Sequence, residues 1–162
     1  MKLTSPKFEN SKKIPEKYTC DGADISPPLE ISDVPKEAKS LVLIMEDPDI
    51  PDFVKKKFNI KMWDHWIIFN IPPNTTKIEE NKNPEGILGV NTGKKNNYSG
   101  PCPPDKEHRY FFKLFALDTI LNLKEGSTKQ QVEQAMQGYI IKDTILMGVY
   151  ERKIIIKKSV FL

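Results

Sequence analysis

Two side chains with ligand-binding chemistry lie at the ends of apolar segments. Asp47 directly follows the apolar segment 41–46, within EDPDIP, and His65 immediately precedes the apolar segment 66–71, within MWDHW. If these segments are consecutive strands that pair antiparallel, the end of the first lies beside the start of the second. The sequence therefore predicts that Asp47 and His65 meet at one edge of a sheet.

The second histidine, His108, follows a stiff loop and opens another apolar segment. The loop, SGPCPPDKE, contains three prolines, which fix φ and remove backbone donors, so it holds its shape before anything binds. If the strand at 109–117 runs in the same direction as the strand at 66–71, His108 reaches the same edge as His65. Both histidines of the chain would then share a site with acidic groups. A stiff surface turn without a site is the alternative.

Histidines beside a glycine suit a small anion. Both rings can donate hydrogen bonds, and Gly100 lacks a Cβ, so its backbone amide can approach a ligand closely. An anion favours protonated histidine, and a nearby carboxylate raises the histidine pKa further. A carboxylate beside an anion makes sense for a zwitterion such as phosphoethanolamine, with the ammonium group on the Asp47 side. Trp63, Trp66 and Tyr110 are candidates for the pocket wall or for stacking on a cation, but core packing is favoured for these aromatics, most of all for Trp66.

The two cysteines do not predict a metal site. Cys20 and Cys102 lie far apart in the sequence and show none of the spacings typical of zinc ligands. Two free thiols are the expectation for a cytosolic protein, and a disulfide between their loops is left open. A hydrolase in which Cys102, His108 and Asp47 act as nucleophile, base and orienting group is a minor alternative, because nothing around Cys102 would lower its pKa.

Composition indicates one globular domain over residues 1–162. Hydrophobic residues make up 38% and charged residues 29% of the chain, and the net charge of +3 is too small to indicate a nucleic-acid partner. The longest apolar segments are too short to span a membrane, and the N-terminus lacks the apolar region of a signal peptide. The cytoplasm is the expected location.

The pattern of short apolar segments predicts an antiparallel β-sandwich with one or two short helices. Strands are expected at 41–46, 66–71, 109–117 and 145–150, and a further strand in the tail at 153–162. One helix is expected within 127–138, because Ser and Thr precede it, a glutamine stands at the position of a capping box, and a glycine ends it.

Several of these motifs resemble one known family. DPDIP, WDHW and GPCPP with the following HRY, in this order, are similar to the phosphatidylethanolamine-binding proteins, also called Raf kinase inhibitor-like proteins, and YTCDGADISPPLEI resembles their bacterial and archaeal branch. The resemblance implies a β-sandwich with a pocket for phosphate, acetate or phospholipid head groups, and no cofactor. By resemblance, the pocket positions are Asp47, Asp49, Pro51, Trp63, His65, Gly100, His108 and Tyr110.

The tail and the segment between the motifs depart from the family pattern. Many eukaryotic members end in a helix over the pocket, whereas the tail here is expected to be a strand and the pocket more open. The lysine-rich segment 52–62 either shapes the pocket entrance or is solvated surface. The sequence thus predicts a non-enzymatic binding protein for a small anion or phosphorylated head group. An inhibitor that acts on a kinase or protease partner, and a homodimer, are left open.

Overall fold

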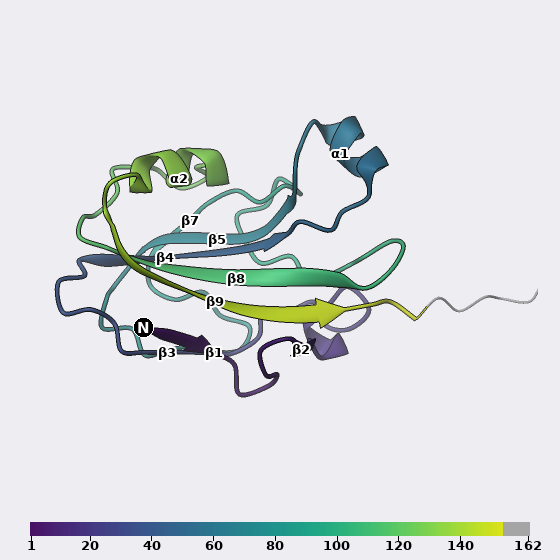
Figure 1. Ribbon diagram of the computed structural model, residues 1–162, viewed down its shortest axis with the longest axis horizontal. Helices are drawn as coiled ribbons and strands as arrows, with labels where there is room; N and C mark the ends of the chain where they lie inside the picture. The colour runs from purple at the N-terminus through teal and green to yellow at the C-terminus, as the bar shows by residue number, and fades with distance from the viewer. Residues whose placement is uncertain (154–162) are drawn as a thin grey trace, which may run out of the picture.

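The computed structural model describes residues 1–153, which form two β-sheets and two short α-helices (Figure 1). The larger sheet has the strand order β2-β9-β8-β4-β5-β7, and the smaller sheet the order β1-β3-β6. The larger sheet consists of β2 (Lys12–Lys13), β9 (Ile140–Tyr150), β8 (His108–Leu117), β4 (Ser40–Asp47), β5 (Trp63–Ile71) and β7 (Ile87–Leu88). The smaller sheet consists of β1 (Lys2–Thr4), β3 (Leu29–Ser32) and β6 (Lys77–Ile78).

Strand β4 lies at the centre of the larger sheet and explains the continuous apolar run in the sequence. All eight of its residues are buried, and it pairs antiparallel with β5 on one side and with β8 on the other. Asp47 is opposite Trp63, and Glu46 is opposite Phe111. The end of β4 therefore lies between the beginnings of β5 and β8, as the sequence predicted.

Both faces of the larger sheet are buried in this region. Leu43, Met45 and Trp66 pack in the core between the two sheets, where Trp66 was expected, and Val42 and Ile44 pack on the other face. That second face is covered by α2 (Lys129–Met136), which contributes Val132 and Met136 (Figure 1). The antiparallel β-sandwich predicted from the sequence is confirmed; the short pair of β2 with β9 is parallel.

The two helices differ in how well the sequence predicts them. The capping box of α2 is confirmed. The backbone N–H of Gln131 donates to the Thr128 hydroxyl, and the backbone N–H of Thr128 donates to the side-chain oxygen of Gln131. Helix α1 (Asp52–Phe58) was not predicted, because it buries no residue and so has no apolar periodicity. It ends at Asn59, whose φ of 53° is left-handed, and it projects beyond the sheets (Figure 1).

The expected strands at 66–71 and 145–150 are longer in the structure, where β5 and β9 begin earlier in the chain. A single-turn 3₁₀ helix, Glu16–Tyr18, precedes the first cysteine. A strand was expected at 153–162 in place of the helix that covers the pocket in many eukaryotic members. From residue 154 on, this segment lies outside the described part of the chain. Among residues 1–153, neither helix has the length and apolar character needed to cross a membrane.

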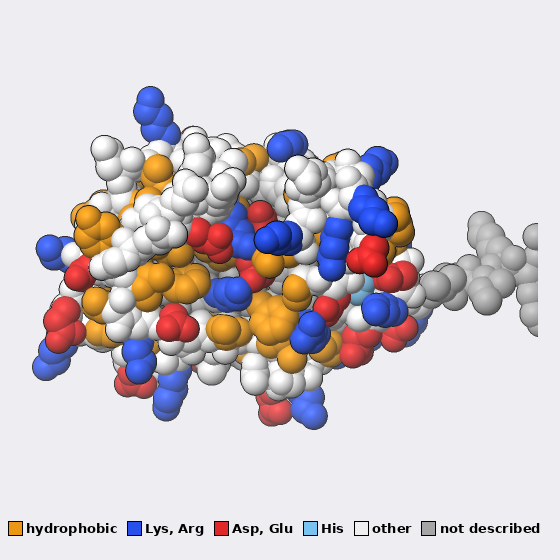
Figure 2. Space-filling view, turned by 45° about the horizontal axis from the view of Figure 1, so that its top comes forward, with side chains coloured by type: hydrophobic (Ala, Val, Ile, Leu, Met, Phe, Trp, Pro, Cys, Tyr) orange, Lys and Arg blue, Asp and Glu red, His pale blue; other side chains and the backbone are white. Residues whose placement is uncertain are grey.

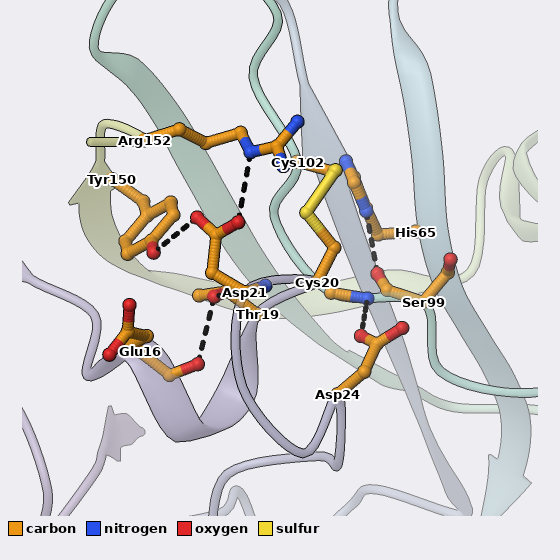
Figure 3. Close-up of a disulfide and its surroundings, with 11 residues drawn as sticks. Glu16, Thr19, Cys20, Asp21, Asp24, His65, Ser99, Cys102, Tyr150 and Arg152 are labelled. Carbon is orange, nitrogen blue, oxygen red and sulfur yellow. Dashed lines mark hydrogen bonds and ion pairs between the residues drawn. A yellow bond between two sulfur atoms is a disulfide. The ribbon is translucent and has the colours of Figure 1, made fainter. Parts of the chain in front are cut away.

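The expectation of free thiols was wrong, because Cys20 and Cys102 form a disulfide. The two loops that carry them lie against each other, with the Cys20 N–H donating to the Pro101 carbonyl oxygen at 3.1 Å, so the Cα atoms are 5.4 Å apart. This proximity comes from the tertiary fold, so the spacing of the cysteines in the sequence does not predict it. The disulfide ties the N-terminal loop to the proline loop that precedes β8 (Figure 3).

Replacing both cysteines with serine should lower the free energy of unfolding by about 2–4 kcal/mol, since the disulfide closes a long loop in the unfolded chain. The loop spans 82 positions. Urea unfolding without reductant measures the loss, and reduced wild-type protein should behave like the double variant. Titration of denatured, unreduced protein that found two reactive thiols per chain would contradict this assignment.

Candidate functional site

A cavity of about 340 Å³ opens where β4 ends and β5 and β8 begin. Its polar lining comes from three strand ends and the proline loop: Asp47, His65, Ser99, Gly100 and His108. Its remaining lining is mostly apolar and comes from the segment around α1, the start of β5 and the proline loop: Ile50, Pro51, Val54, Phe58, Trp63, Cys102, Pro103 and Pro104. A few convergent polar groups in an apolar cavity are typical of a small-ligand site.

His108 lies at the polar end of this cavity between two carboxylates. Its Nδ1 is 2.7 Å from Asp47 Oδ2, and its Nε2 is 2.6 Å from Asp105 Oδ1. The ring is fully buried, whereas the Asp105 side chain is 41% exposed. Because ionised carboxylates only accept hydrogen bonds, the ring donates from both nitrogens and then carries a positive charge. The His108 bond through Nδ1 is internal, and the bond through Nε2 is made to a surface residue.

Asp47 is committed to contacts within the protein. Its Oδ1 accepts the backbone N–H of Asp49 at 2.7 Å, and its Oδ2 faces His108. Burial raises the pKa of Asp47, and the hydrogen bond from His108 opposes this effect. Each oxygen thus has one partner within the protein before any ligand binds.

His65 has a different environment from His108. Its Nδ1 lies 2.6 Å from the carbonyl oxygen of Ser99, and its other nitrogen points away from Ser99 (Figure 3). The ring meets Tyr110 edge-on, with centroids 5.3 Å apart. Burial lowers the pKa of His65 to about 4, and the positive charge of His108 also lowers it, despite the hydrogen bond to Ser99. The expectation of a raised pKa and a protonated ring was therefore wrong for His65, which is neutral near pH 7.

Gly100 lines the cavity, but its amide is not free to bind a ligand. The Gly100 N–H donates to Asp24 Oδ1 at 2.7 Å. A Cβ at this position would lie 2.4 Å from the carbonyl oxygen of Tyr18 and 2.4 Å from Asp24 Oδ1. Glycine is required here because the N-terminal loop packs directly against the backbone, and not because a ligand approaches it.

Two of the expected pocket residues lie outside the cavity lining. Asp49 faces outward and binds Arg109 through both carboxylate oxygens, at 2.8 and 2.9 Å, and these hydrogen bonds lower the pKa of Asp49 to about 2. Tyr110 is fully buried behind the two histidine rings. Burial, together with the charge of Asp47, raises the pKa of its hydroxyl.

The sequence reasoning missed Asp105, Val54 and Phe58. Asp105 stands three residues before His108 in the proline loop, a spacing that could have indicated a contact. Val54 and Phe58 belong to α1, so they could be placed only once the helix was known. The segment around α1 therefore forms part of the pocket wall, while its exposed lysines point to solvent.

On the face shown in Figure 2, histidine is visible as a small patch bordered by acidic and basic side chains.

Comparison with known proteins identifies the family. The family model described as phosphatidylethanolamine-binding protein matches residues 4–151. The chain belongs to the phosphatidylethanolamine-binding protein family. A UPF0098 protein of Chlamydia trachomatis is 48% identical over 152 residues, covering 94% of this chain and 99% of the relative, and one of Methanothermobacter thermautotrophicus is 47% identical with the same coverage.

Solved structures agree with this assignment. A phosphatidylethanolamine-binding protein homologue from Chlamydia trachomatis superposes with a TM-score of 0.88 at 48% identity, over 93% of this chain and 97% of its own. Escherichia coli YbcL, described as a member of the mammalian family, superposes with a TM-score of 0.82 at 29% identity, over 93% and 98%. The resemblance inferred from the motifs is thus confirmed.

The names within the phosphatidylethanolamine-binding protein family describe binding, and none of the relatives above has an enzyme name. The hydrolase alternative also loses its nucleophile in this structure, because the Cys102 sulfur is bonded to Cys20. A thiolate is the reactive form of cysteine, and a disulfide sulfur has no proton for His108 to remove. The contact of His108 with Asp47 that this alternative used is present.

The pKa of His65 predicts how stability depends on pH. Between about pH 6.5 and pH 4 the unfolded chain binds a proton on this histidine that the native protein does not bind, so stability falls as the pH is lowered through this range. The loss should reach about 3 kcal/mol. It should disappear in His65→Asn, whose amide can still donate to Ser99. Proton NMR should show His65 titrating near pH 4; titration near 6.5 would contradict its burial as a neutral ring.

Proposed function

We propose that this protein is a binding protein whose pocket holds a small oxyanion, such as a phosphate group, against His108 Nε2. The observation that carries the proposal is the Asp105 carboxylate, which already lies at 2.6 Å from this nitrogen. A carboxylate and a phosphate offer the same kind of acceptor to a charged ring. An incoming oxyanion would take the place of Asp105 and leave the bond to Asp47 intact.

The surroundings of His108 support an exchange of this kind. The Asp105 side chain is partly exposed and lies in a loop, so it can move into solvent without loss of core packing. Asp47 is buried and held by the backbone of Asp49 as well, so it stays in place. Much of the cavity wall is apolar, including Phe58 and Pro103, and less polar surroundings strengthen a charge-assisted hydrogen bond.

The proposal modifies the model of a zwitterion bound between two histidines and an aspartate. One histidine, His108, supplies the positive charge, and the oxygens of Asp47 are already used. His65 is neutral near pH 7 and contributes a different group to the pocket. The cavity accommodates a phosphate or a small phosphorylated head group within its volume of about 340 Å³.

Removing the competing carboxylate should strengthen anion binding. Asp105→Asn and Asp105→Ala should raise the affinity for phosphate by about threefold to tenfold, since an ion pair whose carboxylate is partly exposed is worth about 1 kcal/mol. Isothermal titration calorimetry near pH 7 measures the affinity. Asp52→Asn on α1 is the matched control, because it also removes an exposed negative charge near the pocket but does not contact His108; it should change the affinity less than about twofold. Wild-type protein that binds no phosphate, or two Asp105 variants with unchanged affinity, would refute the proposal.

A further inference from the structure

The pocket contains a buried acceptor that no described residue uses. His65 is only 5% exposed and lines the cavity, yet its Nε2 has no hydrogen-bond partner among residues 1–153. An unpaired polar atom in a buried position is costly, so it points to a group supplied from outside the chain.

The contact with Ser99 fixes what this nitrogen can do. A backbone carbonyl only accepts hydrogen bonds, so the proton of the neutral ring lies on Nδ1, and the lone pair lies on Nε2 of a ring that lines the cavity. Burial keeps the ring neutral, and the positive charge of His108 also disfavours a second proton. Tyr110 packs against the ring, with centroids 5.3 Å apart. His65 is therefore an acceptor at neutral pH, whereas His108 is a donor.

We propose that His65 makes the pocket selective for oxyanions that also carry a hydrogen-bond donor. The inference rests on the proposed function, since it assumes that the oxyanion binds at His108. Hydrogen phosphate fits both histidines, because one of its oxygens accepts from His108 while its hydroxyl donates to His65 Nε2. Sulfate presents only acceptors, so its oxygen would face the lone pair of His65. The donor can also be an ammonium group attached to the phosphate, as in phosphoethanolamine.

The comparison of phosphate with sulfate tests this selectivity directly. At about pH 8 both are tetrahedral dianions, and hydrogen phosphate keeps one proton that sulfate lacks. Wild-type protein should bind phosphate at least about tenfold more tightly than sulfate in calorimetric titrations, since a sulfate would leave a buried acceptor unpaired. His65→Asn keeps a donor for Ser99 and removes the acceptor. In this variant the ratio of the two affinities should fall to about one.

A second pair of ligands distinguishes the two sources of the donor. At about pH 8 a phosphate monoester has lost its last proton, because its second pKa is about 6. Phosphoethanolamine then still has N–H donors, whereas phosphocholine has none. If the ammonium group serves His65, phosphoethanolamine should bind at least about fivefold more tightly than phosphocholine in wild type and about equally in His65→Asn. If only a P–OH serves, both esters should bind more weakly at about pH 8 than at pH 5, and hydrogen phosphate should keep its affinity.

The outcomes separate this inference from the function on which it rests. Phosphate and sulfate bound with equal affinity by wild type, as a bridging water at His65 would allow, would overturn the selectivity and leave anion binding at His108 in place. A preference for phosphate that persists in His65→Asn would also overturn the role of His65. Binding of neither anion would refute the proposed function, and the selectivity with it.

Discussion

The buried contact between His108 and Asp47 is the interaction around which the site is organised. Both side chains are almost completely removed from water, so the loss of hydration has to be offset by their mutual attraction and by further hydrogen bonds. The Asp49 backbone supplies one of these bonds to Asp47, and Asp105 supplies one to His108. Only the bond to Asp105 can be exchanged at the surface. A ligand that replaces Asp105 must therefore present an acceptor of comparable strength, which restricts the ligand to anions.

The same cavity contains two histidines with opposite roles, and their surroundings cause the difference. Carboxylates accept from both nitrogens of His108, whereas among residues 1–153 His65 pairs with one backbone carbonyl and with no carboxylate. The charge on His108 itself helps to keep His65 neutral. A donor and an acceptor are thus fixed within one pocket before a ligand arrives.

The sequence allowed the convergence of Asp47, His65 and His108 to be predicted, because strand ends and antiparallel pairing follow from apolar periodicity. Protonation could not be predicted in the same way. It depends on which groups lie within hydrogen-bond distance, and the Ser99 carbonyl that fixes His65 is 34 positions away. Helix α1 and the disulfide were not predicted from the sequence, for related reasons. The helix has no buried face, and the cysteines meet only through the packing of two loops.

The stiffness of the proline loop has a cause beyond its prolines. Pro101 accepts from the Cys20 amide, Asp24 accepts from the Gly100 amide, and the disulfide crosslinks the same two loops, so the N-terminal loop fixes the wall of the cavity. The Ser99 carbonyl lies in this braced segment and determines the tautomer of His65. Asp105 lies farther along the loop and contacts His108 through an exposed side chain. The loop thus holds the His65 side of the pocket in place, while Asp105 is exposed. In the proposed function, a ligand would displace this one side chain and would not have to order the pocket.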